Sequence, residues 1–157
     1  GYIKRPSNLS LVFQNPDHQI LMPTCGSELI LNIKGNFSKR VVDQKVKDSL
    51  VSVGLDGFWK RPIHTLSGGQ KQRLAIASAL ISESNFILMD EPTALLDNVT
   101  RKKILGIIKS LIQSKNYPIT VLWITHRMDE LVYADKVSVM RMGKLSSWQD
   151  PKHLKYN

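Results

Sequence analysis

Two carboxylates stand side by side at the end of a short apolar run. Residues 86–89 (Phe-Ile-Leu-Met) lead directly into Asp90 and Glu91. The run predicts a strand buried on both faces, with the carboxylates at its C-terminal end. Such a pair suits phosphoryl transfer, because one carboxylate can hold Mg²⁺, directly or through water, while the other orients or deprotonates an attacking water. Taken alone, a helix N-cap or a surface turn before Pro92 explains the pair equally well.

A second group of residues has the types that bind phosphate. Residues 66–70 (Leu-Ser-Gly-Gly-Gln) open an alanine-rich segment that has helical character to about Ile81. The first amides of a helix lack partners and its dipole makes that end positive, which favours anions. The two glycines would let a phosphate approach the backbone, and Ser67 can cap the helix or donate its hydroxyl. By itself the motif also fits an ordinary capped helix after a tight turn.

Two further polar residues follow apolar runs in the same way. Gln14 comes after residues 9–13, and His126 comes after residues 119–125, which we expect to be a second buried strand. Alone, Gln14 would be a turn residue and His126 a hydrogen-bonded histidine. The carboxyl ends of parallel strands line the ligand crevice of an open sheet. The sequence therefore predicts one site at which an amide, a carboxylate pair and an imidazole meet.

The remaining pattern alternates strands with helices. It predicts a helix after Ser38, with Val42, Val46, Leu50 and Val53 on one face, an amphipathic helix over residues 104–112, a short helix over 128–133, and a terminal antiparallel pair over 136–142 and 144–147. This alternation indicates an α/β domain with a parallel central sheet.

Composition sets limits on the function. The chain has 157 residues, the size of one domain, and a formal net charge of +9. Its basic residues are scattered, without a compact block interleaved with aromatics, so we predict a solvated surface and no nucleic-acid partner. No apolar run is long enough to span a bilayer. The single Cys25 excludes an internal disulfide and is expected to be a small buried residue rather than a nucleophile.

In this order, the motifs resemble the nucleotide-binding domain of ABC transporters over nearly the whole chain. The matching segments are Val-Phe-Gln at 12–14 (Q-loop), Leu-Ser-Gly-Gly-Gln at 66–70 (signature), residues 86–91 (Walker B), Ala-Leu-Leu-Asp at 94–97 (D-loop) and Thr-His-Arg at 125–127 (H-switch). Residues 12–19 and 123–131 most resemble the cobalt-type, energy-coupling-factor branch, which includes bacterial importers of metal ions and vitamins and plastid relatives.

The resemblance implies a fold and a layout. The fold would be α/β and P-loop NTPase-like, with a parallel central sheet and a helical signature subdomain. Residues 1–157 would form one partial ATP-binding domain. Its parts would be the Q-loop region at about 12–19, the helical signature subdomain at about 25–80, the Walker B to H-switch region at about 86–127, and C-terminal strands at about 135–148.

The resemblance also implies roles in ATP hydrolysis. Asp90 would position Mg²⁺ through water, and Glu91 would be the general base for the water that attacks the γ-phosphate. His126 would contact the γ-phosphate. Gln14 would sense Mg²⁺ and the lytic water and couple the site to a membrane subunit.

The other motif residues would act between two subunits. Ser67, Gly68, Gly69 and Gln70 would close on ATP held by a second nucleotide-binding subunit, in a homodimer or a heterodimer. Asp97 would work across the dimer interface. The D-loop has alanine at its first position, where serine is commoner, so one hydroxyl is absent there.

The implied partner is a transmembrane transporter subunit, which would hold the protein on the cytoplasmic or plastid stromal face of a membrane and would receive the region from Gln14 to Thr24. The alternative is a soluble ABC ATPase, for example one acting in cofactor assembly or translation. A third possibility is an interaction fragment without catalysis.

One expected motif is absent from these residues. They contain no Gly-x-x-x-x-Gly-Lys-Ser/Thr loop, the element that cradles phosphates and supplies a lysine and a Mg²⁺ ligand. We expect an N-terminally truncated sequence that lacks the strand, phosphate loop and helix; the rival account is a natural degenerate protein. The fragment alone is expected to be inactive and to expose apolar surface where the missing elements would lie.

Overall fold

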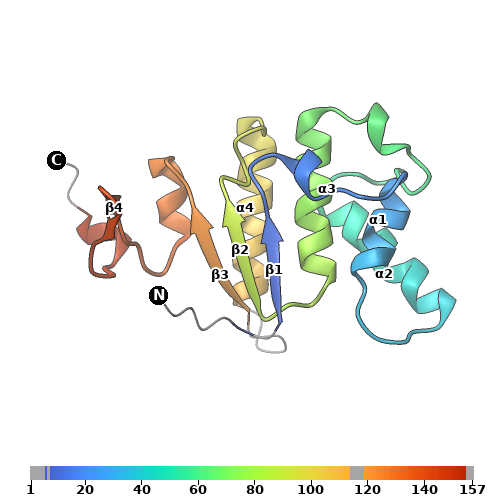
Figure 1. Ribbon diagram of the computed structural model, residues 1–157, viewed down its shortest axis with the longest axis horizontal. Coiled ribbons are helices and arrows are strands. Elements are labelled where there is room, and N and C mark those ends of the chain that lie inside the picture. Colours follow the sequence, from blue (N-terminus) through green and yellow to red (C-terminus); the bar gives the residue numbers. More distant parts are fainter. Residues whose placement is uncertain (1–5, 7, 114–118, 155–157) are drawn as a thin grey trace. The chain divides into compact units, whose positions relative to one another are not determined.

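The computed structural model describes residue 6 and residues 8–113 and 119–154. The chain divides into two compact units, residues 1–124 and residues 125–157. The elements of the first unit are β1 (Leu9–Val12), η1 (Pro16–His18), α1 (Cys25–Asn32), α2 (Lys39–Ser52), η2 (Ile63–Thr65), α3 (Gly68–Ile81), β2 (Phe86–Asp90), α4 (Asn98–Ile112) and β3 (Thr120–Ile124) (Figure 1). The strands predicted over residues 9–13, 86–89 and 119–125 and the helices predicted after Ser38 and Ser67 are confirmed within one or two residues. The helix predicted over 104–112 is present but begins earlier, at Asn98.

Helix α1 was not predicted from the sequence. Thr24 and Ser27 form a capping box at its start, since Thr24 Oγ1 accepts from the amide of Ser27 at 3.3 Å and Ser27 Oγ accepts from the amide of Thr24 at 3.1 Å. A β-carbon on Gly26 would come within 2.9 Å of the Trp59 indole nitrogen and carbonyl oxygen, so this helix needs glycine where it meets Trp59. Eight residues are too few for a helical repeat of apolar positions to show.

The first unit is built on a parallel sheet in the order β1-β2-β3. Leu11, Leu88 and Leu122 are aligned across the strands, and so are Val12, Met89 and Trp123. The predicted parallel arrangement is therefore confirmed, with the C-terminal ends of the strands at one edge.

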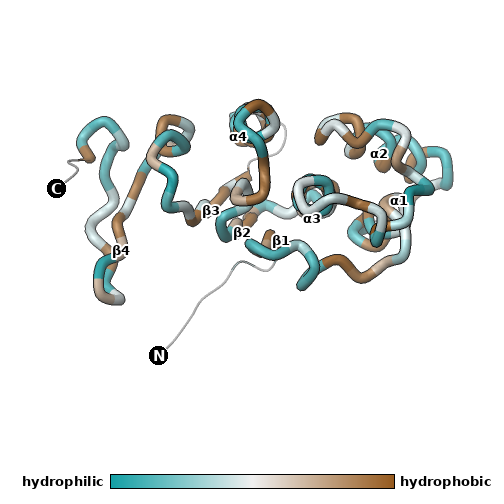
Figure 2. The backbone as a smooth tube through the Cα atoms, turned by 90° about the horizontal axis from the view of Figure 1, so that it is seen from above, coloured by the Kyte–Doolittle hydropathy of each residue, from teal (hydrophilic) through white to brown (hydrophobic). Residues whose placement is uncertain are grey.

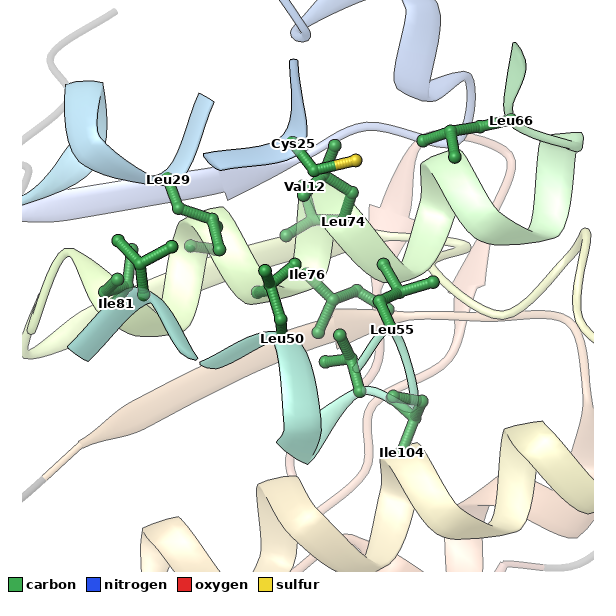
Figure 3. Close-up of a cluster of buried hydrophobic side chains, with 14 of the residues drawn as sticks. Val12, Cys25, Leu29, Leu50, Leu55, Leu66, Leu74, Ile76, Ile81 and Ile104 are labelled. Atoms are coloured by element: carbon green, nitrogen blue, oxygen red, sulfur yellow. The ribbon is translucent and has the colours of Figure 1, made fainter. Parts of the chain in front are cut away.

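One face of this sheet forms the core with the helices. Val12, Ile87 and Met89 point to this face and are at most 1% exposed. Helix α3 lies in the centre of the core, with Leu74 and Ile76 fully buried, which accounts for its alanine-rich composition. Figure 3 shows side chains from β1, α1, α2, α3 and α4 meeting in this cluster.

The opposite face of the sheet is apolar but much less buried. Figure 2 shows α4 on one side of the strands. On the other side, Leu11, Leu122 and Ile124 are 40%, 37% and 48% exposed. The predictions that residues 86–89 and 119–125 form strands buried on both faces are therefore wrong, since Phe86 and Leu88 are only partly buried and β3 alternates between exposed and partly buried residues. A strand is buried on both faces only when both faces are covered.

The second unit contains η3 (Met128–Tyr133), β4 (Met140–Arg141), β5 (Lys144–Leu145) and η4 (Pro151–His153). The predicted antiparallel pair is present but only two residues long on each side. Met142 and Gly143 both have positive φ, 49° and 75°, as a tight two-residue hairpin turn requires. The pair is short because Met140 and Leu145 remain at least 60% exposed and give it little apolar face to bury. Among the described residues, no helix is long and apolar enough to cross a membrane.

Candidate functional site

Gln14 and Glu91 meet at the C-terminal edge of the sheet. Gln14 follows β1 by two residues, and Glu91 follows β2 directly. The side-chain amide of Gln14 donates a hydrogen bond from Nε2 to Glu91 Oε2 at 3.1 Å, across 77 positions of sequence. The predicted convergence of the amide and the second carboxylate is therefore observed.

Glu91 has an unusual backbone conformation. Its φ is 44°, in the left-handed region that non-glycine residues rarely adopt, and its amide donates to the carbonyl of Ile124 on β3 at 2.9 Å. Such a conformation costs on the order of 1 kcal/mol and persists where surrounding contacts enforce it, often at functional sites. The hydrogen bond to β3 is one of these contacts, and the chain bends at Glu91, directly after β2.

Two glutamines that sequence reasoning missed hold the residue before Gln14. The amide of Phe13 donates to Gln19 Oε1 at 2.9 Å, and the carbonyl of Phe13 accepts from Gln72 Nε2 at 3.2 Å. Gln72 is fully buried on α3. A signal was present in the sequence, because helical spacing places Gln72 on the same face as the buried Ala75, Ile76 and Ala79.

The signature motif caps α3. Ser67 Oγ accepts from the amide of Gln70 at 3.3 Å, and Gln70 Oε1 accepts from the amide of Ser67 at 2.9 Å. Of the two roles open to Ser67, capping is thus the one seen here. In the described part of the chain the amides of Gly68 and Gly69 have no acceptor, and they lie at the positive end of a 14-residue helix. These two amides are suited to an anion.

The 94–97 turn lies against the signature. A β-carbon on Gly69 would come within 3.0 Å of the carbonyl oxygen of Leu95, whereas one on Gly68 would lie 3.6 Å from Leu95 Cδ1. The close backbone of Leu95 therefore requires a small residue at position 69, independently of any phosphate that approaches the same glycine. Gly68 is restricted far less.

Asp97 is the N-cap of α4. Its Oδ1 accepts from the amides of Val99 and Thr100, both at 3.0 Å, and its Oδ2 accepts from Thr100 Oγ1 at 2.7 Å. These hydrogen bonds from Thr100 and Val99 lower the pKa of the Asp97 carboxyl. A contact of Asp97 across a dimer interface stays a prediction.

Asp90 and Gln14 are the predicted Mg²⁺ residues. Asp90 is the last residue of β2 and is exposed. The nitrogen of the Gln14 amide is used by Glu91, and its oxygen makes no hydrogen bond within the described residues. Those residues contain no cluster of three or more His, Cys, Asp or Glu side chains arranged for a metal. The Asp90 carboxylate and the Gln14 amide oxygen are oxygen donors of the kind that Mg²⁺ uses together with substrate phosphates and water, and their role as its ligands stays a prediction.

His126 belongs to the second unit, where it follows the end of β3 by two residues and is exposed. Thr125 Oγ1 beside it accepts from the amide of Arg127 at 3.0 Å, which fixes the backbone around His126. The role of His126 at the γ-phosphate stays a prediction.

The fold is that of solved ATP-binding cassettes. The structure of cbiO1 from Clostridium perfringens, described as part of the ABC transporter complex cbiONQ, superposes with a TM-score of 0.77 at 30% identity, covering 92% of this chain and 58% of that one. The ATP-binding cassette MJ0796, solved as a dimer bound to ADP and Pi, gives a TM-score of 0.78 at 27% identity, covering 94% of this chain and 64% of that one.

Sequence relatives point the same way. ABC transporter I family member 10 of Arabidopsis thaliana is 40% identical over 146 residues, which are 92% of this chain and 53% of the relative. The energy-coupling factor transporter ATP-binding protein EcfA of Methanocaldococcus jannaschii is 41% identical over 148 residues, 93% of this chain and 52% of the relative. The chain spans about half the length of the curated relatives it matches. Since residues 3–94 also match the family model described as ABC transporter, the chain belongs to the ABC transporter family of ATP-binding proteins.

Proposed function

We propose that the complete protein is the ATP-binding and ATP-hydrolysing subunit of an ABC-type membrane transporter of the energy-coupling-factor kind. The observation that carries this proposal is the contact between Gln14 and Glu91 at the edge of the sheet, in a chain that also carries an intact signature at 66–70. The relative named for an energy-coupling factor transporter and the solved cbiO1, described as part of the ABC transporter complex cbiONQ, support the transporter class. The resemblance of residues 12–19 and 123–131 to the branch that includes importers of metal ions and vitamins further suggests such a cargo and inward transport.

The residues divide the chemistry between them. Asp90 and the oxygen of the Gln14 amide would hold Mg²⁺, which when bound offsets the negative charge of the phosphates. Glu91 would accept the proton of the attacking water, and its orientation is fixed by the Gln14 amide and by its own left-handed backbone. The amides of Gly68 and Gly69 would bind the ATP of a second nucleotide-binding subunit.

The phosphate loop would come from outside these residues. The absent Gly-x-x-x-x-Gly-Lys-Ser/Thr motif and the half-length coverage of relatives both support this part of the proposal. The coding sequence upstream of Gly1 tests it directly. A strand followed by a glycine-rich, lysine-containing loop is the expected finding; an upstream stop codon with no such loop would favour the degenerate-protein account instead.

Catalysis is tested by Glu91→Gln in the complete protein. This change keeps the size of the side chain but removes the base, so steady-state ATP hydrolysis should fall by at least about 100-fold. Binding of a fluorescent ATP analogue should stay within about twofold of wild type, because no phosphate contact is removed. Normal turnover in the Gln variant would remove Glu91 from the role of base.

The transporter assignment needs a separate test. The complete protein, affinity-purified from its native membranes in mild detergent, should retain a multi-span membrane protein and a second nucleotide-binding subunit. Such a complex would also place it peripherally on the cytoplasmic or plastid stromal face. Recovery with ribosomes or a soluble scaffold, and without a membrane subunit, would favour the soluble ATPase alternative.

A further inference from the structure

Both backbone polar groups of Phe13 are held by glutamine side chains. Gln19, just beyond η1, accepts from the Phe13 amide at 2.9 Å, and Gln72 on α3 donates to the Phe13 carbonyl at 3.2 Å. Phe13 is the link between the end of β1 and Gln14. The peptide groups on both sides of Phe13 therefore have fixed orientations. The backbone position from which the Gln14 side chain extends is fixed with them.

Gln72 makes this contact from inside the core. It is fully buried, and its Oε1 has no hydrogen-bond partner in the described part of the chain. A buried amide oxygen without a donor is unfavourable, and an apolar side chain of similar length would avoid that cost. An apolar side chain would, however, leave the Phe13 carbonyl without its donor.

The neighbouring residue makes a second link between the same elements. Lys71 on α3 forms an ion pair with Asp17 in η1, with 2.6 Å between Nζ and Oδ1. Asn15 Oδ1 accepts from the amide of Asp17 at 3.0 Å, which closes the turn after Gln14. The first turns of α3 thus hold the segment on both sides of Gln14, at Phe13 and at Asp17.

We propose that Gln72 is a positioning residue for Gln14. Through the Phe13 carbonyl it ties the helix that begins with the signature glycines to the Gln14–Glu91 contact, so that a displacement of α3 changes the position of the Gln14 amide. This inference rests on the proposed ATPase function for its consequence, since Gln72 touches neither Glu91 nor a predicted phosphate site. Its effect on hydrolysis would pass through Gln14.

Gln72→Leu in the complete protein tests this role. The variant keeps the buried volume but removes the donor, and a displaced Gln14 should lower kcat for ATP about tenfold or more, because small misplacements of catalytic groups are costly. ATP affinity should remain within about twofold, since no binding group is lost. Ser78→Ala is the matched control, because Ser78 is also buried on α3 at 3% exposure and its hydroxyl has no partner among the described residues. It should leave kcat unchanged.

A double-mutant cycle separates positioning from a general structural role. If Gln72 acts through Gln14, Gln72→Leu should cause little further loss of kcat when Gln14 is already alanine. Full additivity of the two losses would overturn the proposal, and so would a Gln72→Leu variant with wild-type kcat.

Gln72→Glu adds a pH readout that a packing defect would not give. A protonated glutamic acid can donate to the Phe13 carbonyl, whereas the ionised form presents only acceptors. Burial raises the pKa of such a carboxyl, so the kcat of this variant relative to wild type should increase as pH is lowered towards about 5. A ratio independent of pH would contradict the proposed hydrogen bond.

An inactive wild-type protein would refute the proposed function but would not decide the role of Gln72. For that reason the side-chain amide resonances of Gln14 should also be followed by ¹H–¹⁵N NMR. Gln72→Leu should shift them while Ser78→Ala does not, and unchanged Gln14 resonances in Gln72→Leu would overturn the positioning role whether or not ATP is hydrolysed.

Discussion

The carbonyl oxygen of Leu95 occupies the space that a side chain on Gly69 would need, since a β-carbon built on Gly69 would lie only 3.0 Å from it. The two residues come from segments 26 positions apart, and each belongs to a motif expected to act on a nucleotide. The second signature glycine therefore has a structural function within its own chain, which is to let the 94–97 turn lie against the start of α3.

This relationship predicts different results for the two signature glycines. In a helix interior Gly→Ala gains about 1 kcal/mol where the added methyl group is accommodated, and this is the upper limit for the first turn. At Gly68 that methyl would meet only the Leu95 side chain at 3.6 Å, so Gly68→Ala should leave stability equal or improved. Gly69→Ala should be less stable than Gly68→Ala, because the Leu95 backbone must move. Urea denaturation of both variants checks this, and equal or higher stability for Gly69→Ala would show that the contact imposes no constraint.

The parts of the fold that depend on local sequence were predictable. The apolar runs determine where β1 and β2 form, and Ser67 determines where α3 begins, through neighbours only a few residues away. The parallel sheet was predicted from the alternation of strands and helices. The contact between Gln14 and Glu91 was predictable too, because the carboxyl ends of parallel strands meet at one edge. Helix α1 was missed because eight residues carry no clear period.

The burial of a strand face and the partner of a buried side chain depend on residues that are distant in the sequence. Whether Leu122 is buried depends on what covers its face of the sheet, and its own type gives no information about that. The hydrogen bond from Gln72 joins two residues 59 positions apart, and the acceptor is a backbone carbonyl present at every position. Helical spacing could have identified Gln72 as a buried polar residue, but only the tertiary structure identifies its partner.

The cap on α4 should make stability depend on pH through Asp97. The folded state lowers the pKa of Asp97 below its ordinary value of 3.8, by hydrogen bonds from Thr100 and Val99. Its contribution to stability should therefore be fully present above about pH 5 and should be lost as pH falls through the folded pKa. Thermal unfolding of wild type and Asp97→Asn between about pH 6 and pH 2.5 measures it, because the asparagine can cap without titrating.

The difference in Tm between the two proteins should shrink as the solution becomes acidic. Asp97→Ala serves as the reference without a cap and should be less stable than either at neutral pH. A constant difference between wild type and Asp97→Asn over the whole range would show that the charge of Asp97 does not stabilise α4.

Cys25 should be unreactive in the folded protein. It is fully buried at the start of α1, and burial raises the pKa of its thiol, so both access and the thiolate fraction are low. Incubation with Ellman's reagent at pH 7.5 should label less than about a tenth of the protein in the time that fully labels it in denaturant. Rapid labelling without denaturant would contradict the assignment of Cys25 as a structural residue.

The apolar face of the sheet should make the isolated 157-residue chain associate and bind hydrophobic dyes. Leu11, Leu122 and Ile124 are each more than a third exposed on a face whose opposite side is the buried core. An apolar sheet surface of this kind favours association and binding of hydrophobic dyes. Leu122→Thr together with Ile124→Thr should reduce anilinonaphthalene sulfonate fluorescence and light scattering and should cost less than about 1 kcal/mol of stability.

A matched change on the core face should have the opposite result. Ile87→Ala replaces a fully buried residue of the adjacent strand β2, so it should cost about 2–5 kcal/mol and raise dye binding as the chain unfolds. In the complete protein, where we propose that a further strand and helix cover the face, the two threonine substitutions should instead become destabilising. If they cost equally little in both proteins, this face is not the place where the proposed strand and helix bind, and the exposure of Leu122 and Ile124 is a property of the complete fold.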